Sequence, residues 1–144
     1  MPVNKHPKKA SEILKERGIN GKVIAVKIDG KLCDLDTKVD EDAAIEPIEI
    51  DSPEGIEILR HSTSHLMAQA VYRLYPGTKY GVGPAIENGF YYDMDVPTTL
   101  TEEDLPKIEN EMKKIVAEAI PFERLVMSKE EAMRLFKERK DTYK

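Results

Sequence analysis

The sequence predicts an α+β protein made of two small modules, and two observations lead to this prediction. Residues 1–50 combine one short helical pattern with three strand patterns, whereas residues 54–75 form a long amphipathic helical pattern. Between them, Ser52 and Pro53 have the residue types of a helix N-terminus. The chain of 144 residues is therefore expected to divide into domains 1–50 and 51–144.

The first module reads as a helix followed by a small sheet. The elements expected are a helix over 8–18 that stops at Gly18, strands over 23–28 and 31–35 joined at Asp29-Gly30, an acidic loop over 36–42, and a strand over 44–50. The proline at position 47 favours an edge position for the last strand.

The second module is expected to hold an antiparallel sheet backed by helices. After the long helix come strands over 79–86 and 90–96, joined by Glu87-Asn88-Gly89, whose Asn-Gly pair is a hairpin signal. A helix over 101–119 follows, in which Pro106 indicates either an irregular first turn or a later start. The last elements are a strand over 121–126 and a helix over 128–139 that begins with a capping box. Gly81 and Gly83 in the first of these strands indicate either a bulge or the close approach of a backbone or ligand.

Composition indicates a globular protein of the cytoplasm. The chain is 40% hydrophobic and 34% charged, and it contains neither a secretory signal pattern nor an apolar run long enough for a membrane span. The single cysteine, Cys33, excludes an internal disulfide framework and a thiolate cluster for a metal. The net charge of −5 argues against a uniformly basic nucleic-acid binder, so any RNA contact would use the basic ends of the chain.

Two of the three histidines, His61 and His65, lie four residues apart in the long helical pattern. Their side chains therefore share one helix face, on the side of Gln69 and Tyr72 and away from the main apolar stripe. Such a pair can hold a metal, a water or the polar end of a substrate. Without the Glu of His-Glu-x-x-His it is no metalloprotease signature, and two imidazoles alone are an incomplete zinc site.

Three blocks of sequence resemble the editing domain of bacterial-type threonyl-tRNA synthetases. They are Arg60-His61-Ser62-Thr63-Ser64-His65-Leu66, the stretch Gly83-Pro84-Ala85-Ile86-Glu87-Asn88-Gly89-Phe90-Tyr91-Tyr92-Asp93, and Leu100-Thr101-Glu102-Glu103-Asp104. Residues up to about 50 resemble the small β-grasp TGS domain that precedes it, notably in Val26-Lys27-Ile28-Asp29-Gly30-Lys31-Leu32 and Asp34-Leu35.

The resemblance implies a hydrolytic editing site that removes serine wrongly attached to threonine tRNA. His61 and His65 match the histidines of the HxxxH motif, and Lys144 matches a lysine of the same pocket. Tyr92 and the backbone at Gly83 match substrate-binding positions. The resemblance further implies that the editing pocket works without a metal.

The chain departs from the pattern of this family in three ways. It lacks the β-hairpin that opens a TGS domain, the downstream Cys-x-x-x-His of the editing site, and the catalytic remainder that would bind ATP, Mg and Zn. No cofactor is expected in the chain itself. The implied partners are threonine tRNA, through its 3′ end, and the remainder of a homodimeric synthetase. The domain 51–144 is expected to be truncated, and the 144-residue chain to show little deacylation until it is extended.

Two other functions fit the same residues. One is a non-catalytic module that binds RNA or protein through the TGS-like part. The other is a metal-dependent hydrolase like the free-standing editing relatives of alanyl-tRNA synthetase, which share the HxxxH motif.

Overall fold

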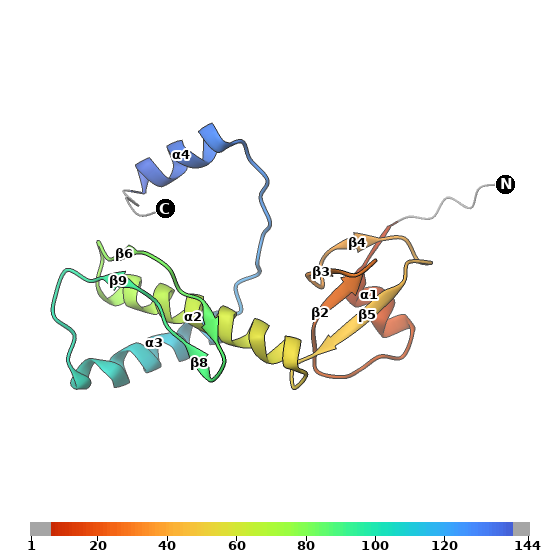
Figure 1. Cartoon of the computed structure of the whole chain (residues 1–144), viewed down its shortest axis with the longest axis horizontal. Helices are drawn as coiled ribbons and strands as arrows, with labels where there is room; N and C mark the ends of the chain where they lie inside the picture. Colours follow the sequence, from red (N-terminus) through yellow and green to blue (C-terminus); the bar gives the residue numbers. More distant parts are fainter. Residues whose placement is uncertain (1–6, 140–144) are drawn as a thin grey trace. The chain divides into compact units, whose positions relative to one another are not determined.

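A computed structural model describes residues 7–139, which form two compact units (Figure 1). The first unit runs to Leu59 and the second begins at Arg60, so the division falls inside one long helix. Both units combine helices with small antiparallel sheets, which confirms the α+β class. The TGS-like and editing architectures stay predictions, and so does the domain boundary at 50–51, because compactness alone does not define a domain.

The first unit packs a short helix against strands. Its elements are β1 (Lys8–Lys9), α1 (Ala10–Glu16), β2 (Val23–Ile28), β3 (Lys31–Cys33), β4 (Lys38–Val39) and β5 (Ile45–Glu49). The main sheet has the order β3-β2-β5 with antiparallel neighbours, and β1 pairs separately with β4. The core buries Ala10, Ile13, Leu14, Val26 and Val39.

The hairpin between β2 and β3 turns where the sequence predicts it. Asp29 and Gly30 both have positive φ, at 50° and 76°, which is the requirement of a two-residue type I′ turn. The expected helix over 8–18 begins only at Ala10, because β1 pairs with β4 inside the expected acidic loop. These two-residue strands are too short to leave a periodic signal in the sequence.

The second unit is built around α2 (Pro53–Leu74), which the first unit shares at its start. The elements that follow are β6 (Lys79–Tyr80), β7 (Ala85–Ile86), β8 (Gly89–Phe90), β9 (Met94–Asp95), the 3₁₀ turn η1 (Glu102–Asp104), α3 (Leu105–Glu118) and α4 (Lys129–Glu138). β6 pairs with β9 and β7 with β8, so the expected sheet is present only as two short antiparallel ladders. The turn residues of the second ladder are Glu87 and Asn88, within the predicted connection 87–89, and Gly89 already pairs in β8.

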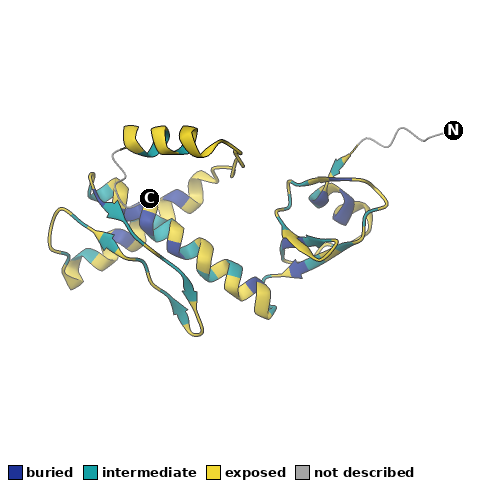
Figure 2. Ribbon diagram, turned by 45° about the horizontal axis from the view of Figure 1, so that its top comes forward, coloured by how far each residue is buried: buried dark blue, intermediate teal, exposed yellow. Residues whose placement is uncertain are grey.

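One face of α2 packs against α3. Ala70 and Val71 on α2 and Ile108 and Ile115 on α3 form the buried centre of this contact (Figure 2). Leu66, Met67 and Leu74 of the predicted apolar stripe border it. Pro106 indicated an irregular first turn or a later helix start, and the structure has the 3₁₀ turn η1 first and α3 only from Leu105. None of the helices in residues 7–139 has the length and hydropathy that crossing a membrane requires.

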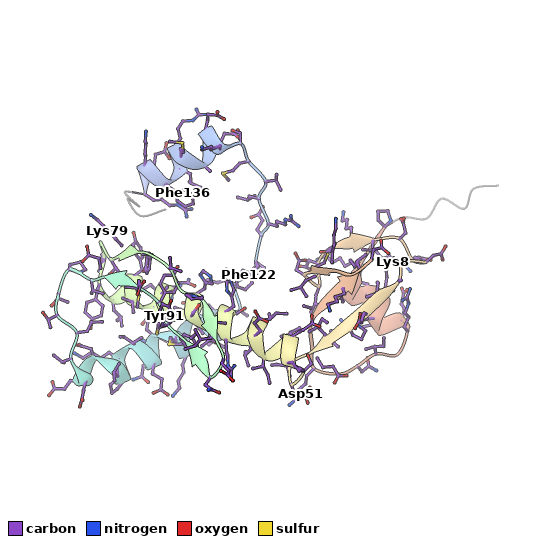
Figure 3. All side chains as sticks on the ribbon, viewed as in Figure 1. Lys8, Asp51, Lys79, Tyr91, Phe122 and Phe136 are labelled. Carbon is purple, nitrogen blue, oxygen red and sulfur yellow. The ribbon has the colours of Figure 1, made fainter. Side chains whose placement is uncertain are left out.

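The predicted strand over residues 121–126 is wrong. This segment joins α3 to α4 without strand pairing to any residue that the structure describes, and Phe122 on it is 96% exposed (Figure 3). A strand pattern predicts extended backbone but cannot supply the neighbouring strand that a sheet needs. The capping box predicted for the following helix is confirmed: Ser128 Oγ accepts from the Glu131 backbone, and Glu131 accepts from the Ser128 N–H.

Candidate functional site

The candidate site is built on α2, which begins at a well-formed cap. Ser52 Oγ accepts a hydrogen bond from the Gly55 N–H at 3.1 Å, and Pro53 occupies the first helical position. His61 and His65 consequently lie in the middle of a helix of 22 residues, where backbone hydrogen bonds fix their direction. Both side chains are exposed and on the same face, as the spacing predicts.

Four side-chain hydrogen bonds tie the irregular segment 79–93 to α2. Ser64 donates to the Gly83 carbonyl at 3.2 Å, and Arg60 donates to the carbonyls of Ile86, at 3.3 Å, and Glu87. In the other direction, the Tyr80 hydroxyl donates to the Ala68 carbonyl at 2.6 Å. The segment thus forms a wall beside the histidine face although its ladders are only two residues long.

The two imidazoles contact each other and the wall. The ring centroids of His61 and His65 are 4.6 Å apart in an edge arrangement, and the centroid of Tyr92 lies 5.7 Å from that of His65. Neutral imidazoles both donate and accept hydrogen bonds, and a tyrosine hydroxyl does the same. The three side chains together can orient one small polar group, such as a water or a hydroxyl.

Gly83 has a steric role in this wall. A Cβ atom at this position would come within 2.2 Å of Cδ2 of Tyr92, so only glycine lets the tyrosine ring lie on the backbone. Close approach, one of the two explanations that the sequence left open, therefore applies here. The approaching group is a side chain of the protein itself.

The histidine face opens onto a cleft of about 750 Å³. Its lining residues come from α2, from the turn that follows α2, from the wall and from the residue after α4: His65, Ala68, Gln69, Tyr72, Gly77, Thr78, Lys79, Tyr80, Tyr92 and Arg139. The ring of Tyr80 lies between those of Tyr72 and Tyr92, with centroid distances of 6.4 and 5.6 Å. The cleft therefore combines aromatic surfaces with amide, hydroxyl and cationic groups.

The sequence pointed to part of this set and missed the rest. It pointed to four of the lining residues, His65, Gln69, Tyr72 and Tyr92. It also singled out His61 and Gly83, which contact His65 and Tyr92. It overlooked Tyr80, whose position next to Lys79 in a short strand gives no periodic signal. Lys144 lies outside the described residues. Among residues 7–139, no three His, Cys, Asp or Glu side chains form a group that could hold a metal.

A partly buried polar contact helps to hold the helices that carry the site. The Tyr75 hydroxyl on α2's C-terminal side donates to Asp104 at 2.9 Å. Hydrogen bonds from the Thr101 backbone, the Tyr75 hydroxyl and Lys107 hold the pKa of the Asp104 carboxyl well below its usual range. The same contact raises the pKa of Tyr75.

A second polar contact joins the ends of α2 and α3. Arg73 binds Glu118 through two parallel hydrogen bonds of 2.7 and 2.8 Å, an arrangement that is stronger and more directional than a single contact. It lowers the pKa of Glu118. The C-terminal half of α2 is therefore held in place by polar as well as apolar groups.

Fold and cleft together describe an α+β protein with a polar, aromatic cleft on the exposed face of one long helix. No family model matches the sequence. Curated relatives do match, and they carry the name threonine–tRNA ligase. This agrees with the resemblance predicted from the motifs, although the names say nothing of TGS or editing domains.

Three of these relatives illustrate the extent of the similarity. The protein from Anoxybacillus flavithermus is 56% identical over 127 residues, which cover 88% of this chain and 20% of the relative. The protein from Fusobacterium nucleatum is 56% identical over 117 residues, covering 81% and 19%. The protein from Halalkalibacterium halodurans is 51% identical over 129 residues, covering 88% and 20%. The chain thus spans about a fifth of the length of the curated relatives it matches.

Proposed function

We propose that this chain serves the attachment of threonine to tRNA, and that its cleft hydrolyses serine wrongly esterified to threonine tRNA. The name shared by the relatives supports the link to threonine tRNA, and the chemistry of the cleft supports hydrolysis. The reaction takes place in the cytoplasm, and the ligand is the 3′ end of the mischarged tRNA.

The physical need for such a site follows from the size of the amino acids. Serine is threonine without one methyl group, and a missing methylene is worth about 1–3 kcal/mol of discrimination, or roughly 10–200-fold. A second site that accepts serine and excludes threonine multiplies this ratio. Hydrolysis at that site needs a positioned water, groups that hold the ester, and a wall close enough to exclude the methyl group.

The residues that line the cleft, together with His61 and Gly83 next to them, can supply these parts. His61 and His65 hold the water or the terminal ribose. One imidazole accepts a proton as the water attacks the ester carbonyl carbon, and this proton passes to the ribose oxygen as the bond between that oxygen and the acyl carbon breaks. Tyr92 and the backbone at Gly83 form the wall. Lys144, by resemblance, stabilises the charge that develops on the ester oxygen. The single observation that carries the proposal is the exposed imidazole pair, with ring centroids 4.6 Å apart, of which His65 lines the cleft beside Tyr92.

The test uses a chimera, because the chain matches only a fifth of its relatives. In the A. flavithermus threonine–tRNA ligase, the matched region is replaced by the corresponding residues of this chain, and the chimera receives serine-charged threonine tRNA. We expect His61→Ala and His65→Ala each to slow deacylation by about 100-fold or more, as for the loss of a general base. Glu57→Ala, an exposed change on the same helix, is the control and should keep the parent rate.

Aminoacylation with threonine, measured in parallel, checks that each chimera is folded. Unchanged deacylation in both histidine variants would contradict the proposal, as would a chimera that charges threonine but never releases serine.

A further inference from the structure

Ser64 lies inside the histidine motif, yet it takes no direct part in the proposed chemistry. Its side chain is fully buried, with 0% exposure, between the face of α2 that packs on α3 and the face that carries His61 and His65. A buried hydroxyl must find hydrogen-bond partners. Ser64 Oγ has two acceptors in reach: the His61 carbonyl at 2.7 Å and the Gly83 carbonyl at 3.2 Å.

These two acceptors belong to two different elements of the second unit. The His61 carbonyl is part of the helix backbone, whereas the Gly83 carbonyl belongs to the wall. A hydroxyl has one proton, so Ser64 shares it between the two carbonyls and holds them at a fixed separation. Ser64 therefore sets the distance between α2 and the wall at Gly83.

The contacts around Ser64 form a closed chain that leads back to the helix. Ser64 binds Gly83, the ring of Tyr92 lies on the α-carbon of Gly83, and Tyr92 contacts His65 with ring centroids 5.7 Å apart. His65 follows Ser64 directly in the sequence. A shift of Gly83 away from α2 would consequently carry Tyr92 away from His65.

We propose that Ser64 is the positioning residue that sets the gap between His65 and the Tyr92 wall, and thereby the largest aminoacyl ester that fits. The substrate part of this inference rests on the proposed function. Discrimination against one methyl group requires the wall to be held within a fraction of an ångström. The Ser64 hydroxyl, buried and bonded to both sides, fits this requirement better than any exposed group of the cleft.

The first test is spectroscopic and needs no tRNA. In the 144-residue chain, the nuclear Overhauser effect between the His65 and Tyr92 rings is compared among variants. We expect Ser64→Ala to weaken it several-fold while amide signals elsewhere in the second unit stay dispersed. Ser62→Ala, a matched change at an exposed position on the same helix, should leave it unchanged. Equal intensity in Ser64→Ala and the parent chain would overturn the proposal.

A second variant covers the case in which Ser64→Ala does not fold. Ser64→Cys keeps nearly the same volume but offers only a weak donor, so the ring contact should weaken in the folded protein. A folded Ser64→Cys variant with the full parental effect would overturn the proposal equally.

The functional test uses the chimera and measures kcat/KM for serine-charged and threonine-charged threonine tRNA. We expect Ser64→Ala to lower the ratio of the two by about tenfold, chiefly because the threonine ester becomes a substrate. A purely structural role would slow both esters alike, and that result would overturn the proposal. If the parent chimera releases no serine, the proposed function is wrong. The nuclear Overhauser effect between His65 and Tyr92 in the Ser64 variants would still test whether Ser64 positions the wall.

Discussion

In the first unit, β2 is bonded along both edges, to β3 and to β5, and this sheet encloses a core with α1. In the second unit, each ladder is two residues long, and side chains from α2 and from the wall make the connections that a wider sheet would make. In the first unit, hydrogen bonds between backbone groups of neighbouring strands fix the path of the chain. The second unit leaves the backbone irregular, so that Gly83 and Tyr92 can approach each other beside the histidines.

The comparison predicts that core truncation acts on the first unit alone. Leu14 is 3% exposed in the first core, so Leu14→Ala should cost that unit about 2–5 kcal/mol of unfolding free energy. The chain has no tryptophan, and its tyrosines all lie in the second unit, so tyrosine fluorescence reports on that unit and far-ultraviolet circular dichroism on both.

We expect the denaturation midpoint by circular dichroism to fall while the fluorescence midpoint stays in place. Leu32→Ala, at a position 53% exposed, is the control and should change either midpoint very little. A parallel fall of both midpoints after Leu14→Ala would mean that the units unfold as one.

The next largest effect belongs to the wall of the second unit. Gly83→Ala forces the new methyl group against the Tyr92 ring, an overpacking expected to cost about 1–3 kcal/mol. Gly89→Ala is the matched control, because a Cβ there meets nothing within 4 Å. The fluorescence midpoint should fall for the first variant only. Equal midpoints for the two would show that the Tyr92 ring moves aside without cost.

A smaller effect is expected from a single anchoring hydrogen bond. Tyr80→Phe removes the donor to the Ala68 carbonyl and should cost about 1 kcal/mol, observed as a lower urea midpoint by fluorescence. Tyr91→Phe removes a hydroxyl from a side chain that is 47% exposed, and it serves as the comparison. If both variants unfold at the same urea concentration, the short ladders would carry the wall without this anchor.

The last effect is a loss of stability in acid that comes from Asp104. The pKa of Asp104 is lower in the folded state than in the unfolded chain, so its contribution is complete above the unfolded value of about 4 and is lost as the pH falls further. Stability of the second unit should therefore decline below about pH 4, and Asp104→Asn should flatten this decline.

The control for the acid experiment is Glu103→Gln, an exposed neighbour, which should keep the parental pH profile. Glu118, whose pKa is also lowered, leaves a residual slope in the Asp104 variant. An unchanged profile in Asp104→Asn would contradict the assigned role of the Tyr75–Asp104 contact.

The same contrast explains which parts of the molecule the sequence could predict. Strand β2 and the Asp29-Gly30 turn follow from local rules, because β-branched residues and a glycine with positive φ leave direct signals. The histidine pair also followed, since helical spacing alone puts His61 next to His65. The contact between Gly83 and Tyr92 did not, because it joins irregular segments whose path depends on side chains of α2. The strand predicted over 121–126 is wrong for a related reason. The strand propensity of a segment does not determine whether a neighbouring strand is present to pair with it.

The boundary between the compact units has a practical consequence for dividing the chain. It falls between Leu59 and Arg60, inside α2, whose capping residue Ser52 lies about two and a half turns before His61. A chain cut at that boundary would begin a new helix at Arg60, with a cation at the positive end of the dipole. Both histidines would then occupy the fraying first turns, and their spacing would be lost with the helix. Residues 52–59 belong to the first unit by compactness, but they form the cap and the first turns of the helix that holds His61 and His65 in position.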